Sequence, residues 1–201
     1  MNVGRVSDSV TRQKTREYQG KNNAIPPRIY QRSLLFFTVD AEKRHPVFRR
    51  EDQVEVLRQA FRQVKPKYPF HIDAMVVLPD HLHSIWTLPE GDEDYSTRWR
   101  LIKTWFTKHC DKSMLKMPNQ ARKRKQQQEI WQHRYWEHVI RDETDYQHHI
   151  DYIHYNPVKH GYVQRAADWP FSSLRNYINR GIVPENWGVS GIEIPDDIGG
   201  E

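Results

Sequence analysis

The first half of the chain alternates strand-like apolar runs with one segment of helical period. Arg32–Asp40 has the composition of a buried strand, and Glu51–Val64 carries its apolar residues at the spacing of an amphipathic helix. Phe70–Leu78 and His81–Leu88 have strand patterns and are separated by a tight break at Pro79-Asp80. These segments predict strand, helix, strand and strand, in that order.

The second half adds a helix, a strand and another helix. Ser96 can cap the first of these helices. Trp131–Ile140 has the pattern of a fourth strand, and Asp142 or Thr144 begins a last helix that runs to about Asn156. This split βαβ order predicts an α+β fold, with one antiparallel sheet and helices on one face.

The two ends of the chain lack this periodic pattern. Residues 1–28 are polar and basic and predict a flexible N-terminal arm, while residues 181–201 predict a flexible acidic C-terminal tail. Residues 29–180 hold the predicted elements and form one domain, interrupted by a basic loop at 111–129. Charge complementarity suggests the hypothesis that the acidic tail occupies a basic cleft and inhibits the protein.

Composition changes this picture by favouring a polyanionic partner. The 201 residues carry a formal net charge of +5 and a pI of about 9.3. The single cysteine excludes a disulfide framework and a thiolate zinc site. The first 28 residues lack the apolar stretch of a secretory signal, and no apolar run reaches the roughly 20 residues of a membrane span. We therefore expect a cytoplasmic, nucleoid-associated protein without membrane contact.

Two histidines separated by one residue stand at the start of the third predicted strand. Residues i and i+2 of a strand point the same way, so His81 and His83 project from one face and Leu82 and Ser84 from the other. Two imidazoles at this spacing suit one metal ion. The chain has 11 histidines, so one such triplet is expected by chance, and the pair alone is weak.

The last predicted helix carries a phenol and a carboxamide one turn apart. Tyr152 lies at the centre of a polar face, roughly opposite an apolar stripe. The stripe consists of Tyr146, Ile150, Ile153 and Pro157. Asn156 can reach the same point in space as Tyr152 and, because it precedes a proline, is expected at the frayed helix end. An ordinary helix stop is the alternative for Asn156, and Tyr155 is a competing phenol.

A metal held by two histidines and an amide, facing a tyrosine, suits attack on a phosphodiester. A phenol has a pKa near 10 and must lose its proton to attack phosphorus. A divalent cation polarises the phosphate and neutralises charge, and these three ligands leave coordination positions open for phosphate and water. A phosphotyrosine retains the bond energy of the phosphodiester, so strands can be rejoined without ATP.

Several motifs together are similar to those of one enzyme family. His81-Leu82-His83 resembles the HUH (His-hydrophobe-His) motif, and the run DYIHYNPVKHG at 151–161 resembles the catalytic helix of single-tyrosine HUH transposases. The runs WTLPEGD at 86–92, RYWEH at 134–138 and DWPFSS at 168–173 resemble the REP-associated tyrosine transposases in particular. The match extends over most of the chain, from about residue 32 to residue 177.

The resemblance implies a ferredoxin-like HUH domain over residues 29–180. It implies an enzyme that cleaves and rejoins single-stranded DNA at REP-type hairpins, beside a guide tetranucleotide, through a 5′-phosphotyrosine intermediate. It implies that Tyr152 is the nucleophile and that His81, His83 and Asn156 hold Mg²⁺ or Mn²⁺. Relatives often have Gln or Glu as the third ligand, so the shorter Asn156 is a departure. A monomer and a homodimer with exchanged helices both stay open.

The DNA contacts are predicted from positive charge alone. The candidates are Arg28, Lys103, Arg122, Lys123, Arg124, Lys125, Arg134 and Lys159. The alternative is that these residues form a solvated basic surface. Three other functions also stay open: a hairpin-DNA-binding protein without turnover, a metal-dependent nuclease that activates water, and an RNA-binding protein that uses aromatic side chains.

Overall fold

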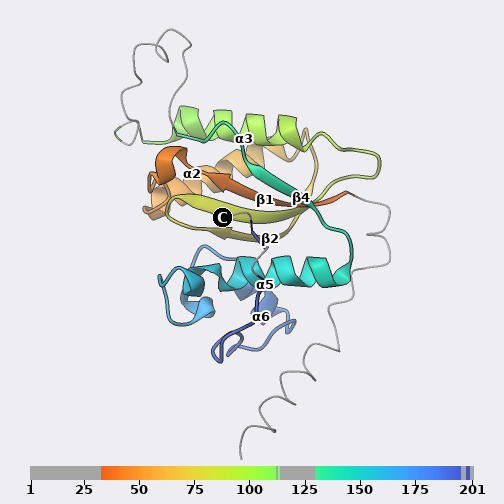
Figure 1. The fold of residues 1–201 in the computed structure, drawn as a ribbon. Coiled ribbons are helices and arrows are strands. Elements are labelled where there is room, and N and C mark those ends of the chain that lie inside the picture. Colours follow the sequence, from red (N-terminus) through yellow and green to blue (C-terminus); the bar gives the residue numbers. More distant parts are fainter. Residues whose placement is uncertain (1–32, 112, 114–129, 196–197, 200–201) are drawn as a thin grey trace, which may run out of the picture.

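The computed structural model describes residues 33–111, 113, 130–195 and 198–199 (Figure 1). The predicted N-terminal arm and most of the predicted basic loop lie outside these residues. The elements in chain order are β1 (Leu34–Asp40), the 3-10 helix η2 (Glu42–Arg44), α2 (Glu51–Val64), β2 (His71–Val77), β3 (His81–Thr87), α3 (Tyr95–His109), β4 (Trp136–Val139), α5 (Glu143–Lys159), the 3-10 helix η4 (Ala166–Asp168) and α6 (Leu174–Asn179). The predicted order of strands and long helices is therefore confirmed.

The four strands form one sheet in the order β2-β3-β1-β4, and every neighbouring pair is antiparallel. β1 and β2 are joined through α2 with β3 inserted between them, which is the split βαβ arrangement. The predicted α+β class and antiparallel sheet are confirmed.

Helices cover both faces of this sheet rather than one. Leu35, Phe37 and Val39 of β1 pack in one core with residues of α2 and α3, whereas Leu34 and Phe36 pack in a second core with residues of α5. Figure 1 shows α2 and α3 on one side of the sheet and α5 on the other. Alternate residues of a strand point to opposite faces, and β1 is apolar on both, so each face needs a cover. The expectation of helices on one face holds for the crossover helices α2 and α3 and is wrong for α5.

Aromatic side chains fill the core beneath α2 and α3. Trp86 of β3 and Trp99 of α3 are fully buried and stack with ring centroids 4.3 Å apart. Phe37 and Phe70 pack against Trp86 at 4.9 and 4.2 Å. Much of the aromatic content of the chain therefore serves packing.

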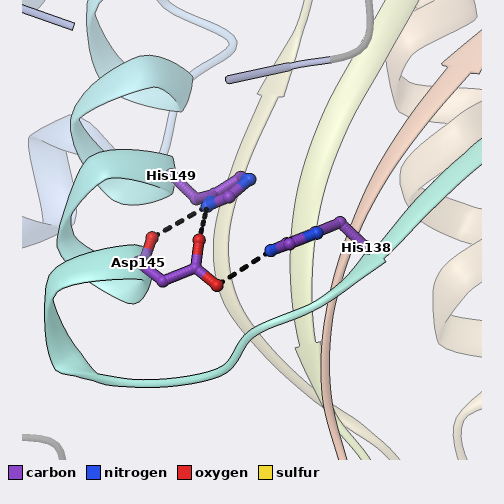
Figure 2. Close-up of side chains that lie close together, drawn as sticks. All are labelled: His138, Asp145 and His149. Atoms are coloured by element: carbon purple, nitrogen blue, oxygen red, sulfur yellow. Dashed lines mark hydrogen bonds and ion pairs between the residues drawn. The ribbon is translucent and has the colours of Figure 1, made fainter. Parts of the chain in front are cut away.

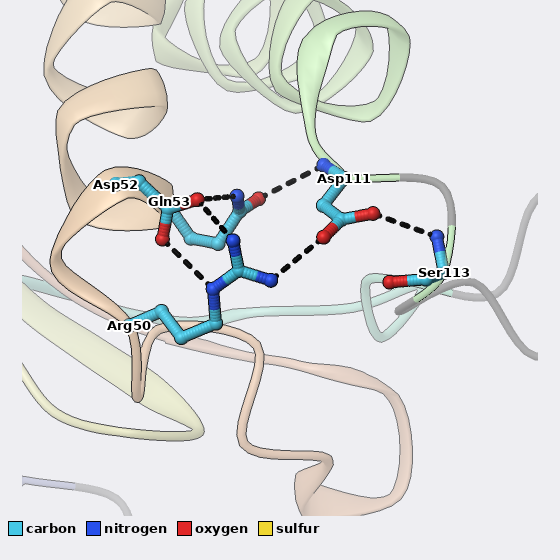
Figure 3. A network of polar contacts seen from close by, with 5 residues as sticks. All are labelled: Arg50, Asp52, Gln53, Asp111 and Ser113. Atoms are coloured by element: carbon cyan, nitrogen blue, oxygen red, sulfur yellow. Dashed lines mark hydrogen bonds and ion pairs between the residues drawn. The ribbon is translucent and has the colours of Figure 1, made fainter.

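A polar network ties the start of α2 to the end of α3 (Figure 3). Arg50 donates to Asp111 at 2.7 Å and to both carboxylate oxygens of Asp52 at 3.0 and 2.5 Å. The main-chain N–H of Asp111 donates to Gln53 at 3.1 Å, and Gln53 is buried. These bonds hold the two crossover helices together at the end of the sheet where α2 begins.

Two element boundaries differ from the prediction. Asp94, not Ser96, caps α3, because the helix begins one residue before Ser96 and the Asp94 carboxylate accepts from the N–H of Thr97 at 3.0 Å. β4 begins only at Trp136, and Trp131 forms no more than an isolated bridge with Ala41. Among the described helices, none has the length and apolar character of a membrane span.

Candidate active site

His81 and His83 lie side by side on the face of the sheet that α5 covers. Their ring centroids are 4.9 Å apart, and both side chains are buried. The antiparallel register places His83 opposite Thr38 and His81 opposite Asp40 on β1. The predicted projection of both histidines from one face is therefore confirmed.

The hydrogen bonds of these histidines fix their tautomers. Nδ1 of His81 lies 2.6 Å from the carboxylate of Asp80, which only accepts, so this nitrogen carries the proton. The Thr38 hydroxyl donates its single proton to the carbonyl of Gly199 at 2.6 Å, so at 2.9 Å from His83 it accepts from Nδ1. In neutral imidazoles this leaves the lone pair on Nε2 of both rings. The sequence patterns assigned Asp80 no role beyond a chain break and assigned Thr38 no role.

Tyr152 is packed against this pair. Its ring lies 5.0 Å from that of His83 and 6.1 Å from that of Phe36, and its side chain is fully buried. The expectation of a polar face opposite the apolar stripe is wrong. Ile153 is only about 100° from Tyr152 around the helix, so the apolar stripe and the Tyr152 side both face the broad sheet.

Asn156 also lies inside α5 and not at a frayed end. Its carbonyl accepts from the N–H of His160 at 3.0 Å, and the helix continues through Pro157 to Lys159. Proline disfavours helical backbone angles at the residue before it, here Asn156. Burial of Pro157 and a cap at the C-terminus of the helix outweigh this preference. Within the described part of the chain, neither polar atom of the buried Asn156 amide has a hydrogen-bond partner.

The end of α5 brings a third histidine to the site. Gly161, with φ of 71°, donates to the carbonyl of Val158, and Tyr162 donates to that of Pro157, which is the Schellman arrangement. This cap directs the ring of His160 to 5.4 Å from that of His81. Tyr152, Asn156 and His160 thus follow one another at four-residue spacing opposite the two strand histidines, and His160 was missed because helix period alone does not show where α5 crosses the sheet.

Lys159 and Tyr155, the two other residues predicted on this helix, have different neighbours. The ammonium of Lys159 is 4.7 Å from the centre of the Tyr152 ring. Tyr155, the competing phenol, has its described ring contact with Trp187, at 6.4 Å. Lys159 is therefore beside Tyr152, whereas Tyr155 packs on the C-terminal segment.

The remaining predicted DNA contacts are scattered or outside the described residues. Lys103 is on α3, across the sheet from Tyr152, where its ammonium lies over the rings of Trp131 and Tyr135 and burial lowers its pKa to about 8. Arg134 is exposed in the segment before β4. Arg28, Arg122, Lys123, Arg124 and Lys125 lie outside the residues that the structure describes.

A second cluster of possible metal ligands joins β4 to α5 (Figure 2). The carboxylate of Asp145 accepts from His138 at 2.8 Å and from the side chain of Arg141 at 3.2 Å. Burial raises the pKa of Asp145, but these hydrogen bonds outweigh it and bring the pKa to about 2. Nδ1 of His149 donates to the Asp145 carbonyl at 2.8 Å, so this nitrogen has no lone pair for a metal and only Nε2 of the ring keeps one. The geometry favours a hydrogen-bonded network over a metal site.

The C-terminal segment covers Tyr152. The buried Gly199 accepts from Thr38, and a Cβ on Gly199 would overlap the Tyr152 ring. Ile194 and Ile198 of the same segment pack against the core that contains Tyr152. In this arrangement a DNA strand has no access to the phenol.

Asp151, next to Tyr152, gives a test of the burial of α5. Burial raises its pKa to about 6, although Gln147 donates to it at 2.8 Å. Between pH 4 and 6 the folded state binds a proton at Asp151 that the unfolded state does not. The stability that this carboxyl contributes is therefore fully present below about pH 4 and is lost as the pH rises through 6. We expect Asp151→Asn to raise the free energy of unfolding by about 1–2 kcal/mol at pH 8 and to change it little at pH 4. Urea unfolding at both pH values checks this, and equal effects would contradict it.

Comparison with known proteins decides the family. No protein-family model matches the chain. The REP-associated tyrosine transposase of Escherichia coli strain K12 is 47% identical over 152 residues, which are 76% of this chain and 82% of that protein. The chain belongs to the REP-associated tyrosine transposases. The resemblance inferred from the motifs is thereby confirmed.

Other REP-associated tyrosine transposases support the same membership. A Haemophilus influenzae relative named for this family is 42% identical over 155 residues, 77% of this chain and 87% of the relative. A solved structure of a REP-associated tyrosine transposase bound to a REP hairpin has 42% identity and a TM-score of 0.68. It covers 84% of this chain and 91% of that one, so the fold is shared over nearly the whole described structure.

Proposed function

We propose that this protein cuts and rejoins single-stranded DNA at REP-type hairpins, with Tyr152 as the nucleophile. The family supports a transposase role that includes hairpin binding. The observation that carries the proposal is the packing of Tyr152, at 5.0 Å, on a histidine pair whose tautomers present Nε2. A guide tetranucleotide beside the hairpin belongs to the same proposal. Because one chain supplies both the phenol and the histidines, we propose a monomer that acts in cis.

The donor set fits a divalent metal, Mg²⁺ or Mn²⁺, held by His81, His83 and Asn156. Ligating histidines usually donate their other N–H to an oxygen acceptor, as His81 does to Asp80. A buried amide without a hydrogen bond costs about 1–3 kcal/mol, and a metal bound to its oxygen would offset that cost. When bound, the metal would polarise the scissile phosphate and neutralise developing charge.

The side chains around Tyr152 suit the covalent step. The Lys159 ammonium lies 4.7 Å from the centre of the Tyr152 ring, where its positive charge can offset negative charge that develops beside the phenol during attack. Attack of the Tyr152 oxygen on phosphorus forms the 5′-phosphotyrosine and breaks the bond to the 3′ oxygen, which leaves as a 3′-OH after taking up a proton. Attack by a 3′-OH on the same phosphorus reverses the step and rejoins a strand.

The test is a covalent-adduct assay on the intact chain. Single-stranded REP-type hairpin DNA from the host, labelled at either end, is incubated with Mn²⁺ or with EDTA and run on denaturing gels. We expect a shifted band that carries the DNA 3′ of the cut, only with metal, and mass spectrometry that places the nucleotide on Tyr152.

The same assay separates the rival functions. Cleavage without an adduct would support a hydrolytic nuclease. Hairpin binding without cleavage or adduct would support a non-catalytic binding protein. Stronger binding of a matched RNA hairpin than of the DNA hairpin would favour an RNA-binding protein.

We also propose that the segment around Gly199 must leave before DNA enters. An alanine at 199 places a methyl group where the Tyr152 ring lies, so the segment has to shift. We expect Gly199→Ala to raise the initial rate of adduct formation about tenfold, equivalent to ~1.4 kcal/mol of segment docking. Gly191→Ala is the matched control, because Gly191 also has positive φ but nothing lies near its added Cβ. Equal rates in the two variants would remove the inhibitory role.

A further inference from the structure

An aromatic cavity continues the row of candidate catalytic residues. It has a volume of about 370 Å³, in the lower range of small-ligand sites. It is lined by Pro79, in the turn that leads to His81, and by aromatic residues that include Phe48, Tyr162 and Trp169. Among the described residues, Arg49 is the one charged residue that lines it, and its side chain is exposed.

A continuous series of rings connects this cavity to the histidine pair. His160 lies 5.4 Å from His81, and Tyr162 stacks on His160 at 5.8 Å and 24°. The rings of Tyr162 and Trp169 also stack, with centroids 5.5 Å apart and an interplanar angle of 26°. A ligand group beside Tyr162 would therefore be connected to His81 through the rings of Tyr162 and His160.

The walls of the cavity are held in place by the backbone. The Schellman cap at Gly161 fixes the direction in which Tyr162 leaves α5. The indole N–H of Trp169 donates to the carbonyl of Val77 at 2.9 Å, which fastens that ring to the end of β2. Tyr162 nevertheless remains 42% exposed, so part of its ring is open to a ligand.

From these observations we propose that the cavity receives one unpaired base of the DNA strand, next to the phosphate that is cut. Aromatic rings bind bases of any type through their faces, and an arginine at the rim suits the adjoining phosphate. In the part of the chain that the structure describes, no acidic side chain lines the cavity to repel that phosphate. This inference rests on the proposed function, and it assigns the Trp-Pro-Phe motif at 169–171 to substrate binding.

The test measures stacking separately from cleavage. Hairpin DNA with unpaired flanks is made as a series, each member with one flanking nucleotide replaced by an abasic site. Affinity is measured by fluorescence anisotropy, with EDTA present so that no strand is cut. Tyr162→Leu removes the ring, Tyr162→Phe keeps it, and Trp105→Leu is the matched control, since Trp105 also stacks on a histidine, His109 at 3.8 Å, but on α3 across the sheet.

We expect Tyr162→Leu to weaken binding of the complete strand about tenfold, with little change in Tyr162→Phe and Trp105→Leu. At one flanking position the abasic site should cost the wild type about tenfold and the Tyr162→Leu variant nothing. Arg49→Gln should weaken DNA binding. It should also reduce the salt dependence of the affinity by an amount equivalent to about one phosphate contact.

Two results would overturn this proposal. One is equal affinity of wild type and Tyr162→Leu for every strand. The other is a loss in Tyr162→Leu that stays the same whichever base is removed, because the tyrosine would then support the fold and not a base. The proposed function fails in a different way, by absence of a wild-type adduct with Mn²⁺, and the anisotropy measurements do not depend on that adduct.

Discussion

Tyr152→Phe is expected to abolish the covalent DNA adduct and to lower strand cleavage by more than about 1,000-fold, since the variant keeps the ring but loses the oxygen that we propose attacks phosphorus. The ring contacts with His83 and Phe36 are preserved, so hairpin affinity and thermal stability should stay close to those of the wild type. The adduct is detected on denaturing gels, and hairpin affinity is measured by fluorescence anisotropy.

Tyr155→Phe is the matched control for this change. It removes the same oxygen three residues along the same helix, where the ring packs on Trp187. The control should cleave at nearly the wild-type rate. If Tyr155→Phe lost the adduct and Tyr152→Phe kept it, the nucleophile would be reassigned to Tyr155.

His83→Ala is expected to have the second large effect, through loss of a metal ligand. Removing one of the three proposed protein ligands should lower the affinity for Mn²⁺ at least about 100-fold and cleavage by a similar factor at limiting metal. Mn²⁺ binding is measured directly by electron paramagnetic resonance, independently of activity.

His71→Ala serves as the control for a histidine of the same sheet. His71 begins β2 and is exposed, and its ring bonds only to Asp73 among the contacts described for it. It should bind Mn²⁺ as the wild type does. Equal Mn²⁺ affinity in His83→Ala and His71→Ala would exclude the proposed metal site, provided that circular dichroism shows both variants folded.

Much of the fold follows from patterns within single segments. The period of two in β1 and β3 and the helical period of α2 arise from local backbone geometry, and α2 has the predicted bounds at Glu51 and Val64. The predicted element boundaries failed where a competing local group or a tertiary contact determined where a helix begins or ends. Asp94 offered a better cap than Ser96, and packing carried α5 past Pro157.

The candidate site shows the same division. Tyr152, His81, His83 and Asn156 can be found from motifs, because the spacing of each pair is a property of one strand or one helix. Asp80 and Thr38, which orient the histidines, could not be assigned, since Thr38 reaches His83 only through the pairing of β1 with β3. His138, Asp145 and His149 also meet only because β4 and α5 are brought together.

The sequence by itself therefore determined the family, the order of elements and the chemical groups on each element, all of which depend on neighbours a few residues apart. Only the tertiary structure decided which face α5 covers, that Tyr152 is buried under Gly199, and that Tyr162 and Trp169 continue the site beyond His81. These features join residues from distant parts of the chain. They depend on which segments pack against each apolar surface, and no local sequence pattern specifies that packing.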